Sequence, residues 1–310
     1  MKKLVSVILP TYNRAHLLDR SIKSVLKQTY ENFELIVVND GSSDETERRV
    51  KEYQKLDKRT KYVKNDKSLG VSSARNIGIK IAKGDFIAFQ DDDDEWLPLK
   101  LEKQVSALES LPQKYALCFT AFYKEEGGKK FYFPDNNLKA ICQSNEKIKK
   151  KLLEGSFFIP TLSMMIKKEI LFKVGFFDEK MLMWVDYDLL MRILLKKYFI
   201  QFIEEPLWHY YQTPNSLSFQ GGKIYRKTKL YIFKKYFKEI KEDKKILSHW
   251  HQELGHLYML EKEEKIAKNY FKKAIKNNPL NFYLFLQFII SLLGANFYLF
   301  FSKIKKIRKI

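Results

Sequence analysis

Four consecutive aspartates occupy positions 91–94, directly after the apolar segment FIAFQ and before Glu95 and Trp96. Neighbouring carboxylates repel one another and resist ionising together, so a folded chain usually supplies them with a cation. Their hard oxygen atoms suit Mg²⁺ or Mn²⁺, and such an ion, held by one or two carboxylates, completes its shell with phosphate oxygens and water. The run therefore predicts a divalent metal ion bound beside a pyrophosphate. The alternative is a solvated surface loop, which is what most short acidic runs are.

The segments around the aspartates alternate between strand and helix patterns. Continuous apolar or β-branched runs predict strands, and apolar residues spaced by three and four predict helices. The predicted strands are 5–10, 33–40, 61–65 and 85–90, and the predicted helices are 16–28, 42–56 and 70–84. Such alternation is typical of an α/β fold whose mostly parallel sheet is covered by helices on both faces.

Polar clusters follow three of these predicted strands. PTYNR at 10–14, NDGSSDET at 39–46 and DDDDEW at 91–96 each begin where a strand ends. Parallel sheets bind their ligands at the carboxyl ends of the strands. We therefore expect the three clusters to meet at one edge of the sheet, where a single ligand could contact all of them.

Length and composition limit the class of protein. A chain of 310 residues with 45% hydrophobic residues can form one large α/β domain plus a smaller appendage. Cys118 and Cys142 show no paired spacing and no histidine cluster, so neither a disulfide framework nor a structural zinc site is predicted, and a reducing compartment fits best. The first apolar run, LVSVILP, is too short for the core of a signal peptide, which favours a cytoplasmic location.

The positive charge is concentrated near the end of the chain. Residues 221–310 hold 21 Lys and Arg against 7 Asp and Glu, a net +14 of the +20 that the whole chain carries. A nucleic-acid partner would call for a recognisable nucleic-acid fold or for basic residues interleaved with stacking aromatics on one face, and we find neither in the sequence. We therefore expect no nucleic acid as partner, and an anionic membrane surface instead.

The basic region also carries a helical repeat pattern. Its residues fit the tetratricopeptide signature L-G-x-x-Y, then A-x-x-x-F-x-x-A and a closing proline, at Leu254, Gly255, Tyr258, Ala267, Phe271, Ala274 and Pro279. One such repeat cannot bury its own apolar face, so residues 280–290 are expected to add a covering helix. The domains are thus predicted to be 1–220 and 221–310, and the helical module offers a possible contact for a protein partner.

Residues 282–301 contain no charged side chain and are long enough to span a membrane. Gly294, Ala295 and Asn296 interrupt this stretch as a turn would, so we predict two shorter helices. In the second, basic residues surround an apolar face of Phe297, Phe300 or Phe301, Ile304 and Ile307. This pattern is typical of an amphipathic helix that lies in a membrane interface.

Four segments together resemble a known family. They are VSVILPTYNR, LIVVNDGSSDET, GVSSARNIGIKIAKGDFIAFQDDDDEWLP and VGFFDEKMLMWVDYDLLMRI, and they lie within about residues 4–220. In order and spacing they are similar to the inverting glycosyltransferases of family 2, which have a GT-A fold. The resemblance implies a Rossmann-like, mostly parallel central sheet flanked by helices, and a metal-dependent transfer of sugar from a nucleotide donor.

The resemblance also implies which residues contact the nucleotide. Pro10, Thr11 and Tyr12 match the family's first nucleotide-contacting turn, with Tyr12 placed to meet the base. Asp40 corresponds to the aspartate that hydrogen-bonds a uracil-type ring. These four residues are therefore expected to line the base pocket.

The segment SARN, which contains Arg75 and Asn76, sits where the family places polar side chains near the nucleotide. The resemblance thus assigns Arg75 to the donor site. A structural alternative is open, in which Ser72 and Ser73 cap a helix and Arg75 lies on an exposed face.

Within the aspartate run, the family motif falls on the first three residues. The resemblance assigns the approach to the ribose and the metal to Asp91 and Asp92, and the principal metal bond to Asp93. Asp94 more often orients the loop in this family. With four aspartates in a row, the register could slip by one.

An inverting sugar transfer is a single displacement, in which one carboxylate removes the proton of the attacking acceptor hydroxyl. The family places this base in an E-D pair before a helix reading D-L-x-x-R. Here Val185 replaces the glutamate, Asp186 matches the base, and Asp188 and Arg192 follow at the family spacing. The alternative for Asp186 is a plain helix N-cap.

Two further segments match family landmarks. Residues 170–180 resemble the G-x-F-D-E turn, which buries its phenylalanines beside the acceptor site, and residues 206–218 resemble a closing loop over the donor. His209 is the histidine near this region, and we expect it to pack or hydrogen-bond rather than bind metal.

The sequence thus predicts a metal-dependent inverting transferase using Mn²⁺ or Mg²⁺. It would move a hexose or N-acetylhexosamine from a nucleotide sugar, with UDP expected, to a hydroxyl of a cell-surface glycan precursor such as lipopolysaccharide, lipooligosaccharide or capsule. The acceptor would be a glycan or lipid-linked glycan, reached by a cytoplasmic protein peripheral at the inner face of the cell membrane. The replacement at Val185 keeps open a non-catalytic interaction protein built on a degenerate transferase domain.

Overall fold

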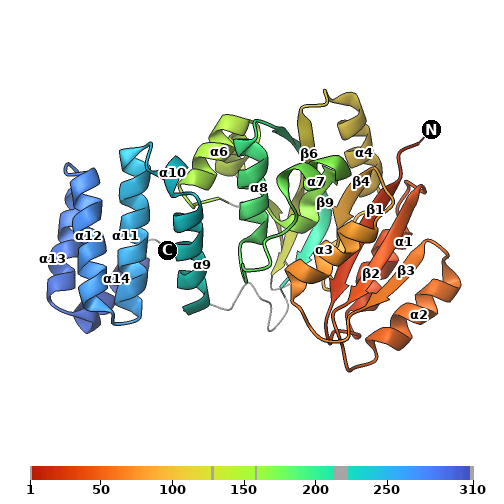
Figure 1. Ribbon diagram of the computed structural model, residues 1–310, viewed down its shortest axis with the longest axis horizontal. Helices are drawn as coiled ribbons and strands as arrows, with labels where there is room; N and C mark the ends of the chain where they lie inside the picture. Colours follow the sequence, from red (N-terminus) through yellow and green to blue (C-terminus); the bar gives the residue numbers. More distant parts are fainter. Residues whose placement is uncertain (1, 127–128, 158, 213–222, 308–310) are drawn as a thin grey trace. The chain divides into compact units, whose positions relative to one another are not determined.

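The computed structural model describes residues 2–126, 129–157, 159–212 and 223–307. The chain forms two compact units, Met1–Lys149 with Phe158–Pro214, and Lys150–Phe157 with Asn215–Ile310 (Figure 1). The predicted domain boundary at residue 220 lies outside the described residues.

The first unit is built on a nine-stranded sheet in the order β3-β2-β1-β4-β8-β6-β9-β5, with β7 paired to β6. Its first four strands are β1 (Val5–Thr11), β2 (Phe33–Asn39), β3 (Thr60–Lys64) and β4 (Phe86–Phe89). These four strands run parallel to one another, so the predicted α/β class and all four predicted strands are confirmed.

Helices connect these strands and cover both faces of the sheet (Figure 1). They are α1 (Leu18–Leu26), α2 (Thr46–Leu56) and α3 (Val71–Ile81). The inward residues of α1 and α2 share one core with Val7 and Leu9 of β1. Ile8 points to the other face, where a Cβ on Gly78 of α3 would come within 2.6 Å of its side chain. Alternation along β1 thus places α3 opposite α1 and α2.

The second half of the sheet mixes strand directions. It contains β5 (Glu95–Trp96), β6 (Tyr115–Glu126), β7 (Lys129–Phe133), β8 (Met164–Lys167) and β9 (Phe199–Tyr211). Strand β8 is antiparallel to β4 and β6, whereas β9 is parallel to β6 and antiparallel to β5. Because β5 directly follows the aspartates, its pairing with β9 ties the end of this unit to the aspartate loop.

Helical segments connect the strands of this second half. They are α4 (Lys100–Ser110), α5 (Asn136–Cys142), α6 (Asn145–Leu153), η1 (Thr161–Ser163), α7 (Lys168–Val174) and α8 (Val185–Leu195).

The second unit is helical. It contains α9 (Lys223–Lys235), α10 (Phe237–Ile240), α11 (Lys244–Leu260), α12 (Glu264–Asn277), α13 (Phe282–Leu292) and α14 (Ala295–Ile307). Phe271 of α12 is fully buried, and a Cβ on Gly255 of α11 would lie 2.9 Å from its ring. The glycine therefore permits the close approach of the two helices, and the predicted helical hairpin is confirmed.

The apolar stretch 282–301 forms parts of two short helices, α13 and α14, as predicted. They are separated at Gly294, whose φ of +92° favours glycine. Among the described residues, no helix combines the length and apolarity needed to cross a membrane. The side chains of residues 302–310, which include the basic end, lie outside the described ones.

Candidate active site

The turns after β1 and β2 are joined by hydrogen bonds. The Asn13 backbone N–H donates to Ser42 Oγ at 2.9 Å, and the Ser43 N–H donates to Asn13 Oδ1 at 2.8 Å. The Ala15 N–H donates to Asp44 Oδ2, also at 2.9 Å. Since β1 and β2 are parallel neighbours, their carboxyl ends meet, and the predicted convergence of the first two clusters is confirmed.

Two arginines bring the aspartate loop to the same edge. Arg14, in the turn after β1, places Nη1 2.7 Å from Asp92 Oδ1 and 3.0 Å from Asp93 Oδ2. Arg75 of α3 places Nη2 2.6 Å from Asp91 Oδ1. All three polar clusters therefore converge, and protein cations accompany three of the four aspartates. The role of Arg14 was missed from sequence, although its place directly after a strand was a usable signal.

The fourth aspartate holds the loop in place. Asp94 is buried, and its Oδ1 accepts a hydrogen bond from the Tyr211 N–H at 2.8 Å, while the Gln90 side-chain amide donates to its carbonyl at 2.9 Å. Burial, together with the nearby Asp93 charge, raises the pKa of Asp94 well above its usual value. Arg20 also binds the loop, donating to the Asp93 carbonyl and lying 3.9 Å from the centre of the Tyr211 ring.

Exposure distinguishes the aspartates by position. The side chains of Asp91 and Asp93 are 28% and 13% exposed, whereas that of Asp92 is 6% exposed and Asp94 is buried. Burial raises the pKa of Asp92 to about 6, the Asp93 charge adds to the effect, and Arg14 opposes it. The first and third carboxylates are therefore the more accessible pair.

These carboxylates fit a hard divalent cation in their chemistry. Within the described part of the chain, no group of three or more His, Cys, Asp or Glu side chains is arranged to hold a metal ion by itself. An ion such as Mg²⁺ is usually held by one or two carboxylates plus substrate phosphates and water. Asp93, with Asp91 beside it, can supply that smaller protein contribution.

Asp40 is buried at the end of β2 and already accepts several hydrogen bonds. The donors come from one loop and are the Asn65 and Ser68 side chains and the Leu69 and Gly70 backbone N–H groups, at 2.7–3.0 Å. The carboxylate thus anchors the loop that leads into α3. Its contact with a base stays a prediction, and it would replace at least one of these bonds.

The first predicted nucleotide-contacting residues lie at the end of β1. Pro10 and Thr11 are buried in the strand, opposite Val38 and Asn39 of β2. Tyr12 is exposed just beyond the strand, so its ring is free to meet a ligand. Their contacts with a nucleotide stay predictions.

Arg75 lies in the interior of the site, against the structural alternative. The N-cap of α3 is Gly70, with a φ of +91°, while Ser72 and Ser73 lie inside the helix. Arg75 is buried, with its guanidinium 5.6 Å from the centre of the Phe177 ring. The alternative, with serine caps and an exposed arginine, was therefore wrong.

Asn76, the next residue of α3, holds the turn that precedes α8. Its side-chain amide donates to the Phe177 carbonyl at 2.9 Å and to Glu179 Oε1 at 2.8 Å. Its Oδ1 accepts from the Phe177 N–H at 3.0 Å. The family landmark at 170–180 thus packs on α3. Phe177 is buried as expected, whereas Phe176 is only partly buried and Phe172 is exposed.

Asp186 is the second residue of α8, and its alternative as the N-cap was wrong because Trp184 holds that position. Its Oδ1 accepts from the Tyr187 N–H at 2.8 Å. Asp186 is half-buried, and desolvation raises its pKa to about 6, with Arg75 opposing the shift and Asp91 adding to it. These two charges act on Asp186 because α8 begins beside the aspartate edge.

Arg192 fixes α8 to the preceding turn, a role that the motif alone did not reveal. Its Nε donates to the buried Asp188 carboxylate at 2.9 Å. Its Nη atoms donate to three backbone carbonyls, those of Val174, Gly175 and Phe176, each at 2.7 Å. The D-L-x-x-R motif is therefore a clamp that sets where α8, and with it Asp186, begins.

His209 and Val185 occupy packed positions. His209 Nδ1 lies 2.8 Å from Glu125 Oε1, and its ring lies 5.4 Å from that of Tyr123, so the expected packing and hydrogen-bonding role is confirmed. Val185 is buried at the start of α8, where the family has a glutamate. Of the closing loop predicted at 206–218, residues 206–211 are the end of strand β9, so this part was wrong, and residues 213–218 lie outside the described residues.

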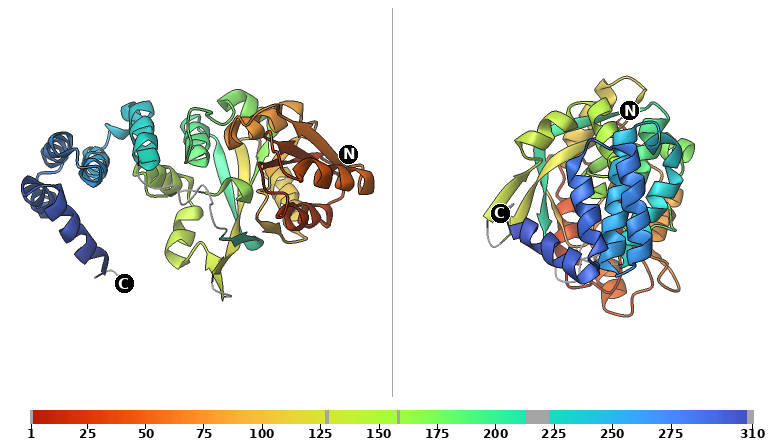
Figure 2. Two further views of the ribbon diagram at one scale, coloured as in Figure 1. Left: turned by 90° about the horizontal axis from the view of Figure 1, so that it is seen from below. Right: turned by 90° about the vertical axis from the view of Figure 1, so that its left-hand side faces the viewer.

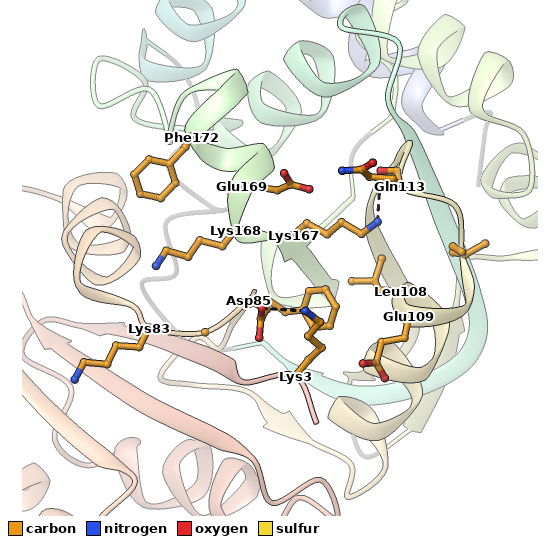
Figure 3. Close-up of a pocket in the computed structure, with 13 residues that line it drawn as sticks. Lys3, Lys83, Asp85, Leu108, Glu109, Gln113, Lys167, Lys168, Glu169 and Phe172 are labelled. Carbon is orange, nitrogen blue, oxygen red and sulfur yellow. Dashed lines mark hydrogen bonds and ion pairs between the residues drawn. The ribbon is translucent and has the colours of Figure 1, made fainter. Parts of the chain in front are cut away.

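A separate hollow of about 930 Å³ lies at the opposite edge of the sheet (Figure 3). Its lining includes Lys3 and Asp85, which precede β1 and β4 and form an ion pair at 3.2 Å, and Lys167 at the end of antiparallel β8. None of the predicted site residues lines it. It is therefore distinct from the edge where the aspartates gather.

Residues 6–172 match the profile of glycosyl transferase family 2. The chain belongs to this family. Among its relatives, an uncharacterised glycosyltransferase of Methanocaldococcus jannaschii, MJ1057, is 36% identical over 238 residues, covering 75% of this chain and 78% of the relative. The Escherichia coli enzyme WfgD, a UDP-Glc:α-D-GlcNAc-diphosphoundecaprenol β-1,3-glucosyltransferase, is 50% identical over 105 residues. That match covers 34% of this chain and 41% of WfgD.

Solved structures of glycosyltransferases share the fold. Staphylococcus aureus TarS residues 1–349, in complex with UDP-GlcNAc, gives a TM-score of 0.63 at 19% identity, covering 88% of this chain and 81% of that one. A Pyrobaculum calidifontis mannosyltransferase, PcManGT, in complex with GDP-Man and Mn²⁺, gives 0.59 at 17% identity, covering 89% and 74%. The predicted GT-A fold of this family 2 glycosyltransferase is thereby confirmed.

Proposed function

We propose that this family 2 glycosyltransferase is a metal-dependent inverting enzyme. It moves a hexose or N-acetylhexosamine from a nucleotide sugar to a hydroxyl of a cell-surface glycan precursor. The observation that carries the proposal is the convergence of three polar clusters at the carboxyl edge of the sheet, where Arg14 and Arg75 contact Asp91, Asp92 and Asp93 at 2.6–3.0 Å.

The donor proposed is a UDP-sugar. Support comes from WfgD, named for UDP-Glc, and from TarS, solved with UDP-GlcNAc. The GDP-Man complex of PcManGT makes a guanine nucleotide the rival. In this chain Pro10, Thr11 and Tyr12 would contact the nucleotide, and Asp40 would recognise the base.

The metal proposed is Mn²⁺ or Mg²⁺, held principally by Asp93. Asp91 and Asp92 would approach the metal and the ribose, and the greater exposure of Asp91 favours it as the second ligand. When bound, such an ion neutralises charge on the departing diphosphate. Arg75, already beside Asp91, would add a positive charge at the same place.

The base proposed is Asp186. A general base works best when its pKa is near the working pH, and burial has moved this carboxyl upward to about 6. Its backbone position is set by α8, which the Arg192 clamp holds to the 174–176 turn. Asp186 would take the proton of the acceptor hydroxyl as that oxygen attacks the anomeric carbon.

The acceptor proposed is a glycan or lipid-linked glycan at the inner face of the cell membrane. WfgD, by its name, acts on GlcNAc linked to diphosphoundecaprenol. The net +14 of residues 221–310 would bring such a chain to anionic lipids as a cytoplasmic, peripheral protein. If the full chain binds anionic vesicles and salt weakens the binding, the result would support this location. No binding at any salt concentration would contradict it.

The reaction is tested by screening nucleotide sugars with Mn²⁺ and Mg²⁺, and by reading the product linkage by NMR. Asp93→Ala should abolish metal-dependent donor binding and turnover. Asp85→Ala is the matched control, because it removes an exposed carboxylate at the opposite edge of the sheet and should leave both unchanged. Undiminished activity in the presence of EDTA would contradict the proposed metal role.

The rival function is a non-catalytic interaction protein, suggested by the buried Val185 in place of the family glutamate. Donor hydrolysis separates the two, because a degenerate domain would leave every nucleotide sugar intact. Hydrolysis that depends on Mn²⁺ and is lost in Asp93→Ala would exclude the rival.

A further inference from the structure

Helix α13 exposes a continuous apolar stripe. Its members recur at spacings of three and four and so lie on one side of the helix. They are Phe282, Phe285, Leu286, Ile289, Leu292 and, just beyond the helix end, Leu293. Apolar side chains scattered singly on a surface are normal, but a continuous row of this size marks an interaction face.

The opposite side of α13 is already packed. Leu284 and Ser291 are buried, and Phe288 packs against the core of the second unit that contains Phe271. Helix α12 lies between α11 and α13, so α13 ends this row of helices (Figures 1 and 2). Among the described residues, no other element therefore covers the stripe. A rotation of α13 about its axis would bury the stripe, but it would also expose Leu284 and Phe288, which are now packed.

The start of α14 also exposes apolar side chains. Phe297, Phe300 and Phe301 are exposed, and the rings of Phe297 and Phe301 lie 5.0 Å apart. We call these three residues and the α13 stripe together the outer face. It comes from a stretch, residues 282–301, that contains no charged side chain.

A basic run follows the outer face in sequence. Lys303, Lys305, Lys306, Arg308 and Lys309 all come within eight residues after Phe301. The described acidic group at the junction of α13 and α14 is Glu264, whose Oε1 accepts a hydrogen bond from the Ala295 N–H at 2.7 Å. An apolar face followed by five cations matches the interface of an anionic bilayer, where tails accept the apolar side chains and headgroups accept the cations.

We propose that the outer face of α13 and α14 inserts into the interface of an anionic phospholipid bilayer. The inference deepens the proposed membrane location and rests on it. Helix α13 has 11 residues, so at about 1.5 Å per residue it extends roughly 16 Å, about half of a hydrocarbon core. It therefore lies along the membrane surface rather than across it.

Insertion of the outer face changes how membrane binding should depend on salt. A basic tail alone would release the protein at high salt, since its attraction is screened within about a Debye length. Burial of the outer face adds a term that salt does not screen. Part of the binding should therefore persist in high salt, and that part should depend on α13.

The experiment uses the full chain and vesicles of phosphatidylcholine mixed with phosphatidylglycerol, in low and high salt. The variant is Ile289→Gln with Leu292→Gln, which removes apolar surface without changing net charge at two positions that are 55% and 54% exposed. The matched control is Leu56→Gln on α2, at 80% exposure. We expect the double variant to bind at least about tenfold more weakly in high salt, and the control to bind like the parent.

Two results would overturn the inference. One is equal binding of the double variant and the parent in high salt. The other is a parent chain that is dimeric without vesicles and a variant that is monomeric, which would make the outer face a contact between two copies. Hydrolysis of the nucleotide sugar without vesicles should be the same in all three proteins, so failure of this inference is distinguishable from failure of the proposed enzyme function.

Discussion

The edge of the sheet that carries Asp91 to Asp94 and the outer face of the second unit differ in whether their side chains have partners within the chain. Each of the four aspartates has a polar partner at 2.6–3.0 Å, supplied by Arg14, Arg75 or the Tyr211 N–H. The outer face, within the described residues, is an apolar row that no other element covers. The difference indicates that the polar groups of the candidate site are paired within the chain, whereas the outer face is left for the membrane proposed above.

The largest effect should come from Asp186→Asn, which keeps the size of the side chain but removes its basicity. If the site is organised in advance, donor affinity should persist while kcat falls by roughly 10²- to 10⁴-fold. The base must be ionised, so the parent rate should rise with pH through about 6 and then level. Steady-state kinetics against pH check both. An equal loss of donor binding and turnover would make Asp186 a structural residue.

Phe271→Ala tests the buried core of the second unit, on the side of α13 opposite the outer face. This ring is fully buried against Gly255 and Tyr298, so its loss should lower the free energy of unfolding by about 3–5 kcal/mol. Denaturant unfolding measures the change, with hydrogen exchange of α11 and α12 to locate it. Donor hydrolysis should persist at a temperature where the variant stays folded, because no assigned catalytic residue lies in this unit.

Arg14→Gln tests whether the Arg14 guanidinium stabilises the fold by neutralising Asp92 and Asp93. Asp92 and Asp93 would lose a shared partner, and since Arg14 is partly exposed we expect the free energy of unfolding to fall by about 1–3 kcal/mol. Added Mn²⁺ should then raise the melting temperature more in the variant than in the parent. The control is Arg48→Gln, whose exposed ion pairs on α2 should matter little. A smaller response of the variant to Mn²⁺ would instead give Arg14 a part in positioning the ligands.

The smallest effect should come from Ile289→Ala on the outer face. Because this side chain is about half exposed and has no covering element described, the free energy of unfolding should change by no more than about 0.5 kcal/mol. Measured beside Phe271→Ala, this shows whether the two sides of the helical unit differ as the structure indicates. A loss of 2 kcal/mol or more, a size typical of buried aliphatic side chains, would mean that something covers the face in solution.

The first half of the sheet could be predicted from sequence because its signals are local. Strand runs and helical spacing lie within ten to fifteen residues, and the rule for parallel sheets then places the polar clusters at one edge. Sequence alone could not tell which of the four aspartates are able to bind a metal. That depends on which side chains are exposed, and the exposure of Asp91 and Asp93 is known only from how the loop packs.

The second half could not be predicted in this way. Strand β5 has two residues, too few to show a period, and its partner His209 lies far along the chain. The carbonyls that Arg192 binds are likewise set by contacts between separate segments, and so, in the first half, is the loop that hydrogen-bonds Asp40. Motif spacing identified Asp188 and Arg192 as a pair, but not that the pair serves to fix a turn.

The bond between Asp94 and the Tyr211 N–H spans 117 residues and has a consequence for synthesis. On the ribosome the aspartate loop emerges long before β9, the strand that orders it and that also closes one side of β6. Until then β6 presents unpaired backbone groups, which can join a strand of another chain. Between the synthesis of β6 and that of β9, the nascent chain therefore carries an open strand edge, and Asp94 lacks its backbone partner.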